Sequence, residues 1–197
     1  TADLAGFSYT EHPDNVALAL RVCASLGVDR PTALRGMHRA APDPGVLTEH
    51  DLRYFGRRIV FVNAFAANDP VSTQMIWNAA LTRHAAVERR IAIFNCRADR
   101  PDRSTQLGRD CASWRQPDHV VLMGTGTYLF ARAAAAAGLD PAKLIFVEGQ
   151  AVADIFETTL GLVGSTALVM GMGNIGGQGL DLARYFRNRS APQEAVA

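Results

Sequence analysis

The segment from Arg57 to Trp77 constrains the fold most, because it has the pattern of a strand, a polar turn and a helix. Residues 59–62, Ile-Val-Phe-Val, do not alternate with polar residues, which indicates a strand buried on both faces. Asp69 suits the N-cap and Pro70 the first turn of the helix that follows. The segment therefore predicts one strand–helix unit of a parallel sheet.

The same alternation of apolar runs and helical segments continues to residue 188. It predicts the α/β class, with a mostly parallel, Rossmann-like sheet flanked by helices and joined by right-handed crossovers. In the first of these helices, Val71, Met75 and Ile76 predict the apolar face. We expect strands at Leu52–Phe55 (an edge strand), 59–62, Ile91–Asn95, Val120–Met123, Leu144–Val147 and Ala167–Met170, and helices at 70–87, 104–114, Thr127–Ala137, Ala151–Leu160 and Gly179–Asn188.

Residues 1–41 are expected to form a separate helical part. His12–Asn15 has the composition of a helix start, and Gly27 suits the position that ends this helix. A second helix is expected at Pro31–Ala40. The turn at 41–45, Ala-Pro-Asp-Pro-Gly, is the best candidate for a hinge. We therefore expect two parts, residues 1–41 and an α/β domain at 42–197.

The composition is that of a globular chain. Its net charge of +1 gives no reason to expect a nucleic-acid partner. Three cysteines are odd in number and lack the spacing of a metal site, so we interpret them as reduced thiols of a cytoplasmic protein. The apolar run Ile155–Gly173 contains Glu157 and several glycines, which favours a helix end and a buried strand over a membrane span.

Ligands of open α/β sheets bind where strands end and helices begin. The first such loop carries Asn63, Asn68, Asp69 and Ser72, and a helix start offers N–H groups to an anion. These four residues are therefore candidates for a binding site. The alternative is a well-capped turn without a ligand.

A second loop at a strand end, residues 95–104, holds the densest charge. Arg97, Arg100 and Arg103 suit the bidentate capture of carboxylate or phosphate, and Asp99 and Asp102 could orient them. The alternative is a solvated loop whose surface ion pairs contribute little.

A third loop, residues 171–176, matches G-x-G-x-x-G and contains Asn174. Dinucleotide binding requires a further strand that ends in an acid about 20 residues later, and only one more helix is predicted. An anion site and a tight turn with positive φ remain the two interpretations. Elsewhere, Thr125 offers a hydroxyl at a strand end, and Glu148 could orient an amine or a metal, or cap a helix. No catalytic residue and no metal ligand is assigned.

Five segments together resemble a known family. The sequence is similar to the ATP-dependent ligase subunit of capsule-type poly-γ-glutamate synthases, in the Mur ligase superfamily. The segments that carry this resemblance are EHPDNVALAL (11–20), GMHRAAPDPG (36–45), FVNAFAANDPVST (61–73), FNCRADRPDR (94–103) and GMGNIGGQGLDL (171–182).

The resemblance implies a fold like the Mur ligase C-terminal domain, preceded by the last helices of an ATPase domain. It implies an ATP- and Mg²⁺-dependent ligase that converts a terminal carboxylate to an acyl phosphate, which the amine of glutamate attacks. The resemblance also implies a homo-oligomer that binds glutamate and poly-γ-glutamate and works with small membrane proteins at the inner face of the membrane. It places His12, Asn15, Asn63, Asn68, Asp69 and Ser72 near the nucleotide. From their positions in the loops at strand ends, we expect Arg97, Asp99, Arg100, Arg103, Thr125 and Asn174 near the substrate.

The sequence also departs from the Mur pattern. The ribose-binding Asp corresponds to Asn63-Ala64, the Lys or His corresponds to Ala66 or Ala67, and the Gly-Arg after the hinge is Gly45-Val46. No G-x-x-x-x-G-K-[ST] phosphate loop occurs, so we expect no ATP turnover from this chain alone. We expect that loop in an upstream segment or a partner copy. A non-catalytic domain that binds an acidic ligand and an NAD-dependent oxidoreductase fragment remain alternatives.

Overall fold

The structure, a computed structural model, describes residues 2–7, 9, 11–40 and 45–190. The chain divides into two compact units, residues 1–48 and 49–197. The expected hinge at 41–45 lies largely outside the described residues, so only its last position, Gly45, is described.

The smaller unit is helical, with η1 (Ala2–Leu4), α1 (Pro13–Ser25) and α2 (Arg30–Arg39). Asp29 caps α2 by accepting a 3.0 Å hydrogen bond from the Thr32 N–H. Gly27 follows α1 with φ of +77°, as expected for a residue just after a helix end. An ion pair between Arg30 and Asp3 ties α2 to η1.

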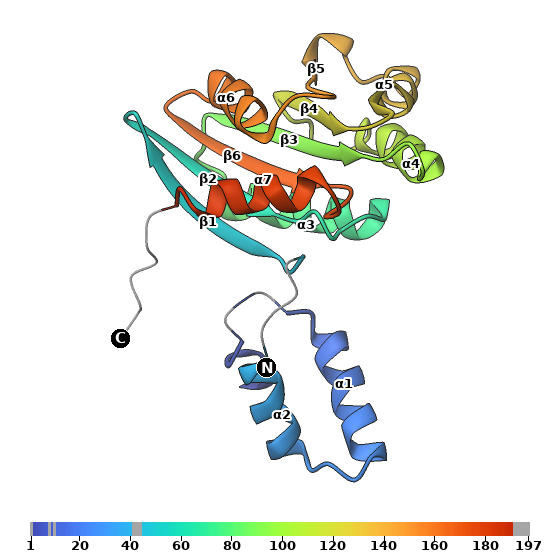
Figure 1. Ribbon diagram of the computed structural model, residues 1–197, viewed down its shortest axis with the longest axis vertical. Helices are drawn as coiled ribbons and strands as arrows, with labels where there is room; N and C mark the ends of the chain where they lie inside the picture. The colour runs from blue at the N-terminus through green and yellow to red at the C-terminus, as the bar shows by residue number, and fades with distance from the viewer. Residues whose placement is uncertain (1, 8, 10, 41–44, 191–197) are drawn as a thin grey trace. The chain divides into compact units, whose positions relative to one another are not determined.

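The larger unit is a six-stranded sheet covered by helices, and it confirms the predicted α/β class (Figure 1). The strand order is β1-β2-β6-β3-β4-β5. The elements are β1 (Thr48–Tyr54), β2 (Arg57–Asn63), α3 (Pro70–Arg83), β3 (Arg89–Cys96), α4 (Pro101–Cys111), β4 (His119–Gly124), α5 (Thr127–Ala136), η2 (Pro141–Lys143), β5 (Leu144–Phe146), α6 (Val152–Leu162), β6 (Thr166–Met172) and α7 (Gln178–Arg187).

The edge strand predicted at Leu52–Phe55 is confirmed as β1, although it begins earlier, at Thr48. A two-residue turn, Phe55-Gly56, joins β1 to β2 and reverses the chain direction. Both turn residues have positive φ, +47° and +75°, as in a type I′ hairpin. β1 is therefore the antiparallel edge of an otherwise parallel sheet.

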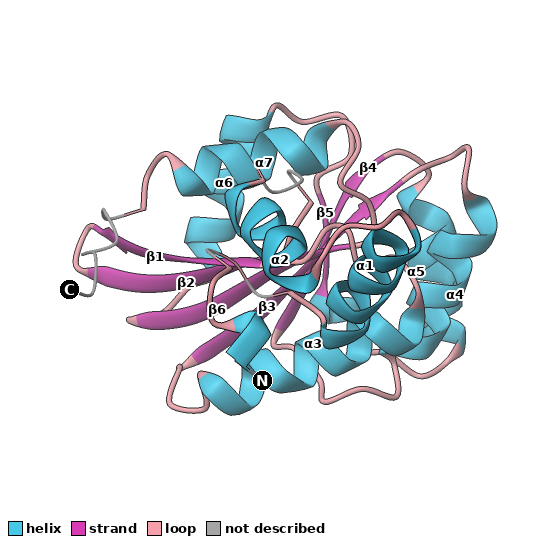
Figure 2. Ribbon diagram, turned by 90° about the horizontal axis from the view of Figure 1, so that it is seen from below, coloured by secondary structure: helices cyan, strands magenta, loops and turns pink. Residues whose placement is uncertain are grey.

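The remaining strands pair in parallel, with β6 inserted between β2 and β3. Figure 2 shows α3, α4 and α5 on one face of the sheet and α6 and α7 on the other. The loops that follow β3 and β6 consequently leave toward opposite faces. The adjacent carboxyl ends of these two strands form a topological switch point, where open α/β sheets bind ligands.

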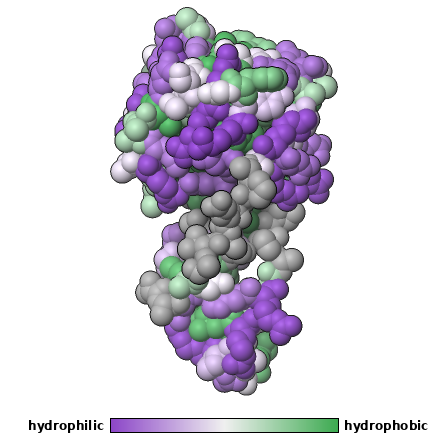
Figure 3. All heavy atoms as spheres, turned by 90° about the vertical axis from the view of Figure 1, so that its left-hand side faces the viewer, coloured by the Kyte–Doolittle hydropathy of each residue, from purple (hydrophilic) through white to green (hydrophobic). Residues whose placement is uncertain are grey.

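The core lies on both faces of the sheet because the central strands are buried along most of their length. The Phe61 ring stacks on Phe186 of α7 with 4.0 Å between centroids, and Phe94 packs on Phe130 of α5. On the face that Figure 3 presents, hydrophilic residues cover most of the larger unit. No helix within the described ranges is long and apolar enough to cross a bilayer.

The structure corrects three local predictions. Helix α3 ends at Arg83 rather than at 87, and α4 ends at Cys111 rather than at 114. The predicted apolar face of α3 is wrong, because Val71 and Met75 are 69% and 64% exposed. The buried face instead carries Trp77, whose indole N–H donates to the Arg115 carbonyl at 2.7 Å. Burial of this large ring with its polar atom satisfied sets the rotation of the helix.

Candidate functional site

A pocket of about 610 Å³ opens at the carboxyl edge of the sheet. Its walls come from the ends of β3 and β4 and from the loops that follow β5 and β6. Arg97 and Glu148 contribute the charged side chains of the lining. The larger unit therefore has a pocket on the edge where the sequence predicted a site.

Asn95, the penultimate residue of β3, joins two of these loops. It is 2% exposed, and its Nδ2 donates to the Asn174 and Gly176 carbonyls at 2.7 and 2.9 Å. In return, Asn174 Nδ2 donates to the Asn95 carbonyl at 3.2 Å. The two asparagines thus connect β3 to the β6–α7 loop (173–177) across the switch point.

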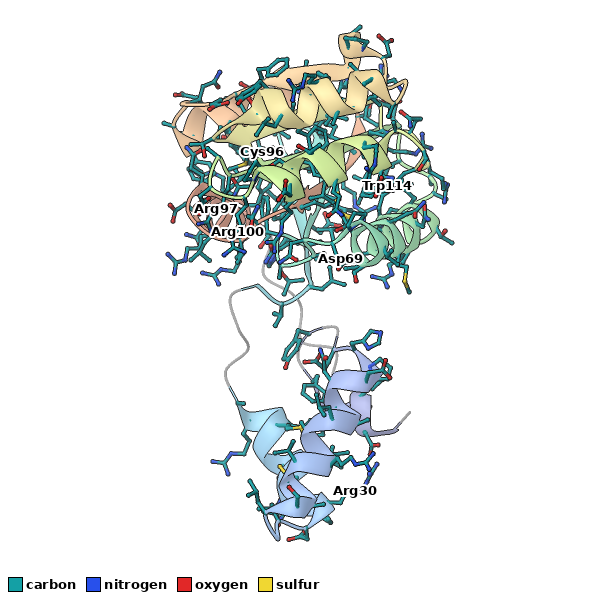
Figure 4. All side chains as sticks on the ribbon, turned by 90° about the vertical axis from the view of Figure 1, so that its right-hand side faces the viewer. Arg30, Asp69, Cys96, Arg97, Arg100 and Trp114 are labelled. Carbon is teal, nitrogen blue, oxygen red and sulfur yellow. The ribbon has the colours of Figure 1, made fainter. Side chains whose placement is uncertain are left out.

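The arginines predicted to act together have different environments. Arg97 lines the pocket, whereas Arg103 Nη1 donates to Asn174 Oδ1 at 3.2 Å. Arg100 is exposed at the N-cap of α4 (Figure 4). Its N–H donates to the Arg97 carbonyl. The structure therefore places all three in one loop and helix start, but only Arg97 in the pocket wall.

Asp99 orients Arg97, as predicted. The carboxylate accepts from Arg97 Nε at 2.9 Å and from Nη2 at 2.6 Å. This bidentate hydrogen bond lowers the pKa of Asp99 and raises the pKa of Arg97. The third nitrogen, Nη1, lies beside the β6–α7 loop, since a Cβ built on Gly176 would be 3.3 Å from it.

Thr125 and Glu148 hold the neighbouring loops. Thr125 Oγ1 accepts from the Ala98 N–H at 3.0 Å, so this hydroxyl connects the ends of β3 and β4. Glu148 accepts from the Gly126 and Thr127 N–H groups, at 2.9 and 3.0 Å, and from the Thr127 hydroxyl. The hydroxyl hydrogen bond, followed by the two backbone N–H groups, lowers the pKa of Glu148 against the effect of burial. Glu148 thus caps α5, which was one of its predicted roles.

Glycine is required at several positions around Asn95. A Cβ on Gly124 would be 2.1 Å from the Cys96 carbonyl oxygen, and one on Gly173 would be 2.9 Å from the Asn95 carbonyl oxygen. Gly124 and Gly173 also have φ of +86° and +98°. The G-x-G-x-x-G segment therefore forms a tight turn with positive φ, as one of its interpretations required.

The residues of the β2–α3 loop lie at the same edge of the sheet but not in the lining of this pocket. Asn63 is buried, Asn68 is half-buried and Asp69 is exposed. Asp69 caps α3 by accepting from the Ser72 N–H at 2.9 Å, and this bond lowers the pKa of Asp69. The capping prediction is confirmed, and the nucleotide contact stays a prediction.

His12 and Asn15 belong to the smaller unit. The His12 Nδ1 accepts from the Asp14 N–H at 3.3 Å at the start of α1. Asn15 donates to Glu11 Oε1 at 2.9 Å. Both side chains are exposed, and their predicted contact with a nucleotide is not tested by these local interactions.

Sequence reasoning missed the structural roles of Asn95 and Gln178. Gln178 lines the pocket and donates to the Gln150 carbonyl at 2.7 Å, which connects the β6–α7 and β5–α6 loops. The available signal for Asn95 was an amide at the end of an apolar strand, where a buried polar side chain needs a partner.

Cys96 and Cys111 are unpaired and buried, and burial raises the pKa of each thiol to about 12. Over the described ranges, no group of three His, Cys, Asp or Glu side chains is placed to hold a metal ion.

Comparison with solved structures supports the fold. MurF from Acinetobacter baumannii matches 86% of this chain and 37% of its own, at a TM-score of 0.57 and 20% identity. MurF from Thermotoga maritima in complex with ADP matches 89% of this chain and 37% of its own, at a TM-score of 0.51 and 14% identity. The TM-scores show a shared fold.

Comparison at the sequence level is more specific. The chain is 35% identical over 171 residues to the Bacillus anthracis "Capsule biosynthesis protein CapB", which covers 87% of this chain and 37% of that protein. The chain thus spans little more than a third of the length of this relative. Residues 49–189 match the family model described as "Poly-gamma-glutamate synthase CapB C-terminal domain". Because this match covers most of the chain and coincides with the α/β unit, the chain belongs to the CapB C-terminal domain family of poly-γ-glutamate synthases.

Proposed function

We propose that this chain is the C-terminal part of an ATP-dependent ligase that forms amide bonds between glutamate residues. The observation that carries the proposal is the pocket at the switch point, in which Arg97 and Glu148 provide one cation and one anion. A free amino acid carries both an ammonium and a carboxylate, so these two groups suit its recognition. Membership of the CapB family makes glutamate the substrate we propose.

In the proposed reaction, a terminal carboxylate of the growing chain takes the γ-phosphoryl group of ATP, giving an acyl phosphate and ADP. The amine of the incoming glutamate then attacks the acyl carbon, loses a proton and expels inorganic phosphate. Arg97 would hold a glutamate carboxylate, and Glu148 would orient the ammonium before its deprotonation. Because accepted hydrogen bonds lower the pKa of Glu148, it is better suited to orient than to remove a proton.

The nucleotide needs contacts that the sequence does not contain. The chain has no phosphate loop, so we propose that this loop is supplied by an upstream segment or a partner copy. The fold is shared with a ligase solved with ADP, which supports nucleotide binding in the complete protein. The described residues suggest no Mg²⁺ ligand, and we assign none.

The proposals for location and partners rest on the family resemblance alone. We propose a cytoplasmic enzyme held at the inner face of the membrane by small membrane proteins, and a homo-oligomer. Co-purification from detergent extracts with and without those proteins would test the attachment. Recovery of all the full-length protein in the soluble fraction when they are present would contradict it.

The decisive test of the function uses the full-length protein with ATP and glutamate. We expect ADP release that depends on glutamate. With an acceptor labelled with ¹⁸O in its terminal carboxylate, one ¹⁸O atom should appear in the released phosphate. Phosphate without label would refute the acyl phosphate, and ADP release independent of glutamate would refute the ligase assignment.

An experiment on the full-length protein also tests the alternative of an NAD-dependent oxidoreductase. The NAD hypothesis predicts saturable binding of the dinucleotide at the glycine-rich β6–α7 loop. The ligase proposal predicts no saturable binding in a calorimetric titration of the full-length protein with NAD. Tight NAD binding would favour an oxidoreductase fragment instead.

A further inference from the structure

Arg97 and Arg103, from the charged segment at 95–104, make different contacts and therefore have different roles. Arg97 is fixed by Asp99 and lines the pocket. Arg103 is half-buried, and its Nη1 donates to Oδ1 of Asn174, which is 7% exposed. The partner of Arg103 is thus a buried amide of the protein, in contrast to the predicted substrate carboxylate.

This contact fixes the orientation of the Asn174 amide. Its Oδ1 accepts from Arg103, and its Nδ2 donates to the Asn95 carbonyl. Asn95 in turn donates to the carbonyls of Asn174 and Gly176. These residues form a continuous chain of hydrogen bonds, the Asn95–Asn174–Arg103 network, from β3 to α4 through the β6–α7 loop.

The network also orients the backbone of the loop. In a trans peptide the C=O of one residue and the N–H of the next point in opposite directions. Because the Gly176 carbonyl points at the Asn95 amide, the Gly177 N–H points away from it, at the start of α7. Gly176 and Gly177 line the pocket with Arg97, whose Nη1 lies beside Gly176.

The network has little space to rearrange. A Cβ on Gly179 would be 2.3 Å from the Asn174 carbonyl oxygen and 2.8 Å from Asn95 Nδ2. Close-packed interiors transmit small shifts instead of absorbing them. A change at Arg103 should therefore displace the β6–α7 loop that forms the pocket wall.

We propose that Asn95 and Arg103 are positioning residues, which hold the β6–α7 loop so that it and Arg97 form one subsite for a substrate carboxylate. The identity of that carboxylate rests on the proposed function. Arg103 acts on it through Asn174 and does not contact it. A misplacement of about 1 Å can cost on the order of 100-fold in rate, so an indirect role can still be large.

A double-mutant cycle in the full-length protein tests this assignment. Arg103→Met and Asn174→Ala should each raise the KM for glutamate by about tenfold and leave the KM for ATP within about twofold. The double variant should be no worse than the more impaired single variant, because both changes break one network. Arg103→Lys retains a donor and should restore most of the loss. Multiplicative effects of the two single changes would overturn the proposal and support direct substrate contact by Arg103.

Arg109→Met is the matched control, since Arg109 is exposed on the same helix and pairs with Asp110. It should leave both KM values unchanged. An equal rise of the glutamate KM in this control would also overturn the proposal.

Hydrogen–deuterium exchange supplies a readout that does not depend on activity. Arg103→Met should speed exchange of the amides at 174–179, whereas Arg109→Met should not. Unchanged exchange in both variants would refute the network, even if the wild-type protein proved to be no ligase. Absence of glutamate-dependent ADP release in the wild-type protein, with the exchange result as expected, would refute only the proposed function.

Discussion

Replacement of Gly124 by alanine tests how closely the pocket is packed around the ends of β3 and β4. Alanine at φ of +86° costs roughly 1–2 kcal/mol relative to glycine. Its Cβ would also be 2.1 Å from the Cys96 carbonyl oxygen, which accepts the Thr125 N–H at 3.1 Å. Relief of the overlap must displace a carbonyl of a central strand, for about 1–3 kcal/mol, and weaken a hydrogen bond, for about 1 kcal/mol.

The expected loss for Gly124→Ala is therefore about 3–6 kcal/mol of unfolding free energy. Gly138→Ala is a matched control, because Gly138 has φ of +99° and no atom lies within 4 Å of the place that an alanine methyl would occupy. It should lose only about 1–2 kcal/mol. Urea unfolding followed by the fluorescence of Trp77 and Trp114, both buried, measures the difference. Equal losses in the two variants would refute the close contact at Gly124.

Three further predictions concern single groups. Glu148→Gln should lower the unfolding free energy by about 1 kcal/mol or less at pH 7, since this exposed carboxylate is screened by solvent. The native pKa of Glu148 lies below its unfolded value, so this difference should disappear as acid titration passes the native pKa; a difference that persists in acid would contradict the capping role. Asp69→Ala should cost about 1 kcal/mol in urea unfolding through loss of the α3 N-cap, and no change would contradict the Ser72 hydrogen bond. Iodoacetamide at pH 8 should label Cys23 in the native protein well before Cys96 and Cys111, whose thiol pKa is raised to about 12; equal native rates, measured by mass spectrometry, would contradict the burial.

Much of the larger unit is predictable because its signals are local. The uninterrupted apolar run at 59–62 and the Asp69-Pro70 start of α3 indicate their structures without long-range information. The rotation of α3 is not local, because the burial of Trp77 depends on the position of the Arg115 carbonyl 38 residues away. The prediction that Val71 and Met75 mark the buried face of α3 was therefore wrong.

In the candidate site, too, the features with local sequence signals were predictable and those that depend on long-range contacts were not. The rule that ligands bind at strand ends pointed to the edge of the sheet that carries the pocket, and Asp99 orients Arg97 as the sequence suggested. The hydrogen bond from Arg103 to Asn174 could not be predicted, because Asn174 lies 71 positions later in the sequence. Only the insertion of β6 beside β3 brings the two side chains together.

The central claim is that Arg97 binds a carboxylate of the glutamate substrate at the carboxyl edge of the sheet. Arg89 provides the matched control, since it lies at the opposite end of the same strand and pairs weakly with Glu88 at 4.0 Å. A charge-assisted hydrogen bond contributes roughly 1.5–3 kcal/mol, which corresponds to about 10- to 100-fold in affinity.

The most direct measurement is therefore the glutamate KM of the full-length protein in Arg97→Ala and Arg89→Ala. The account predicts a rise of at least about tenfold in Arg97→Ala, with the KM for ATP little changed, and no rise in Arg89→Ala. A glutamate KM that is the same in both variants would contradict it.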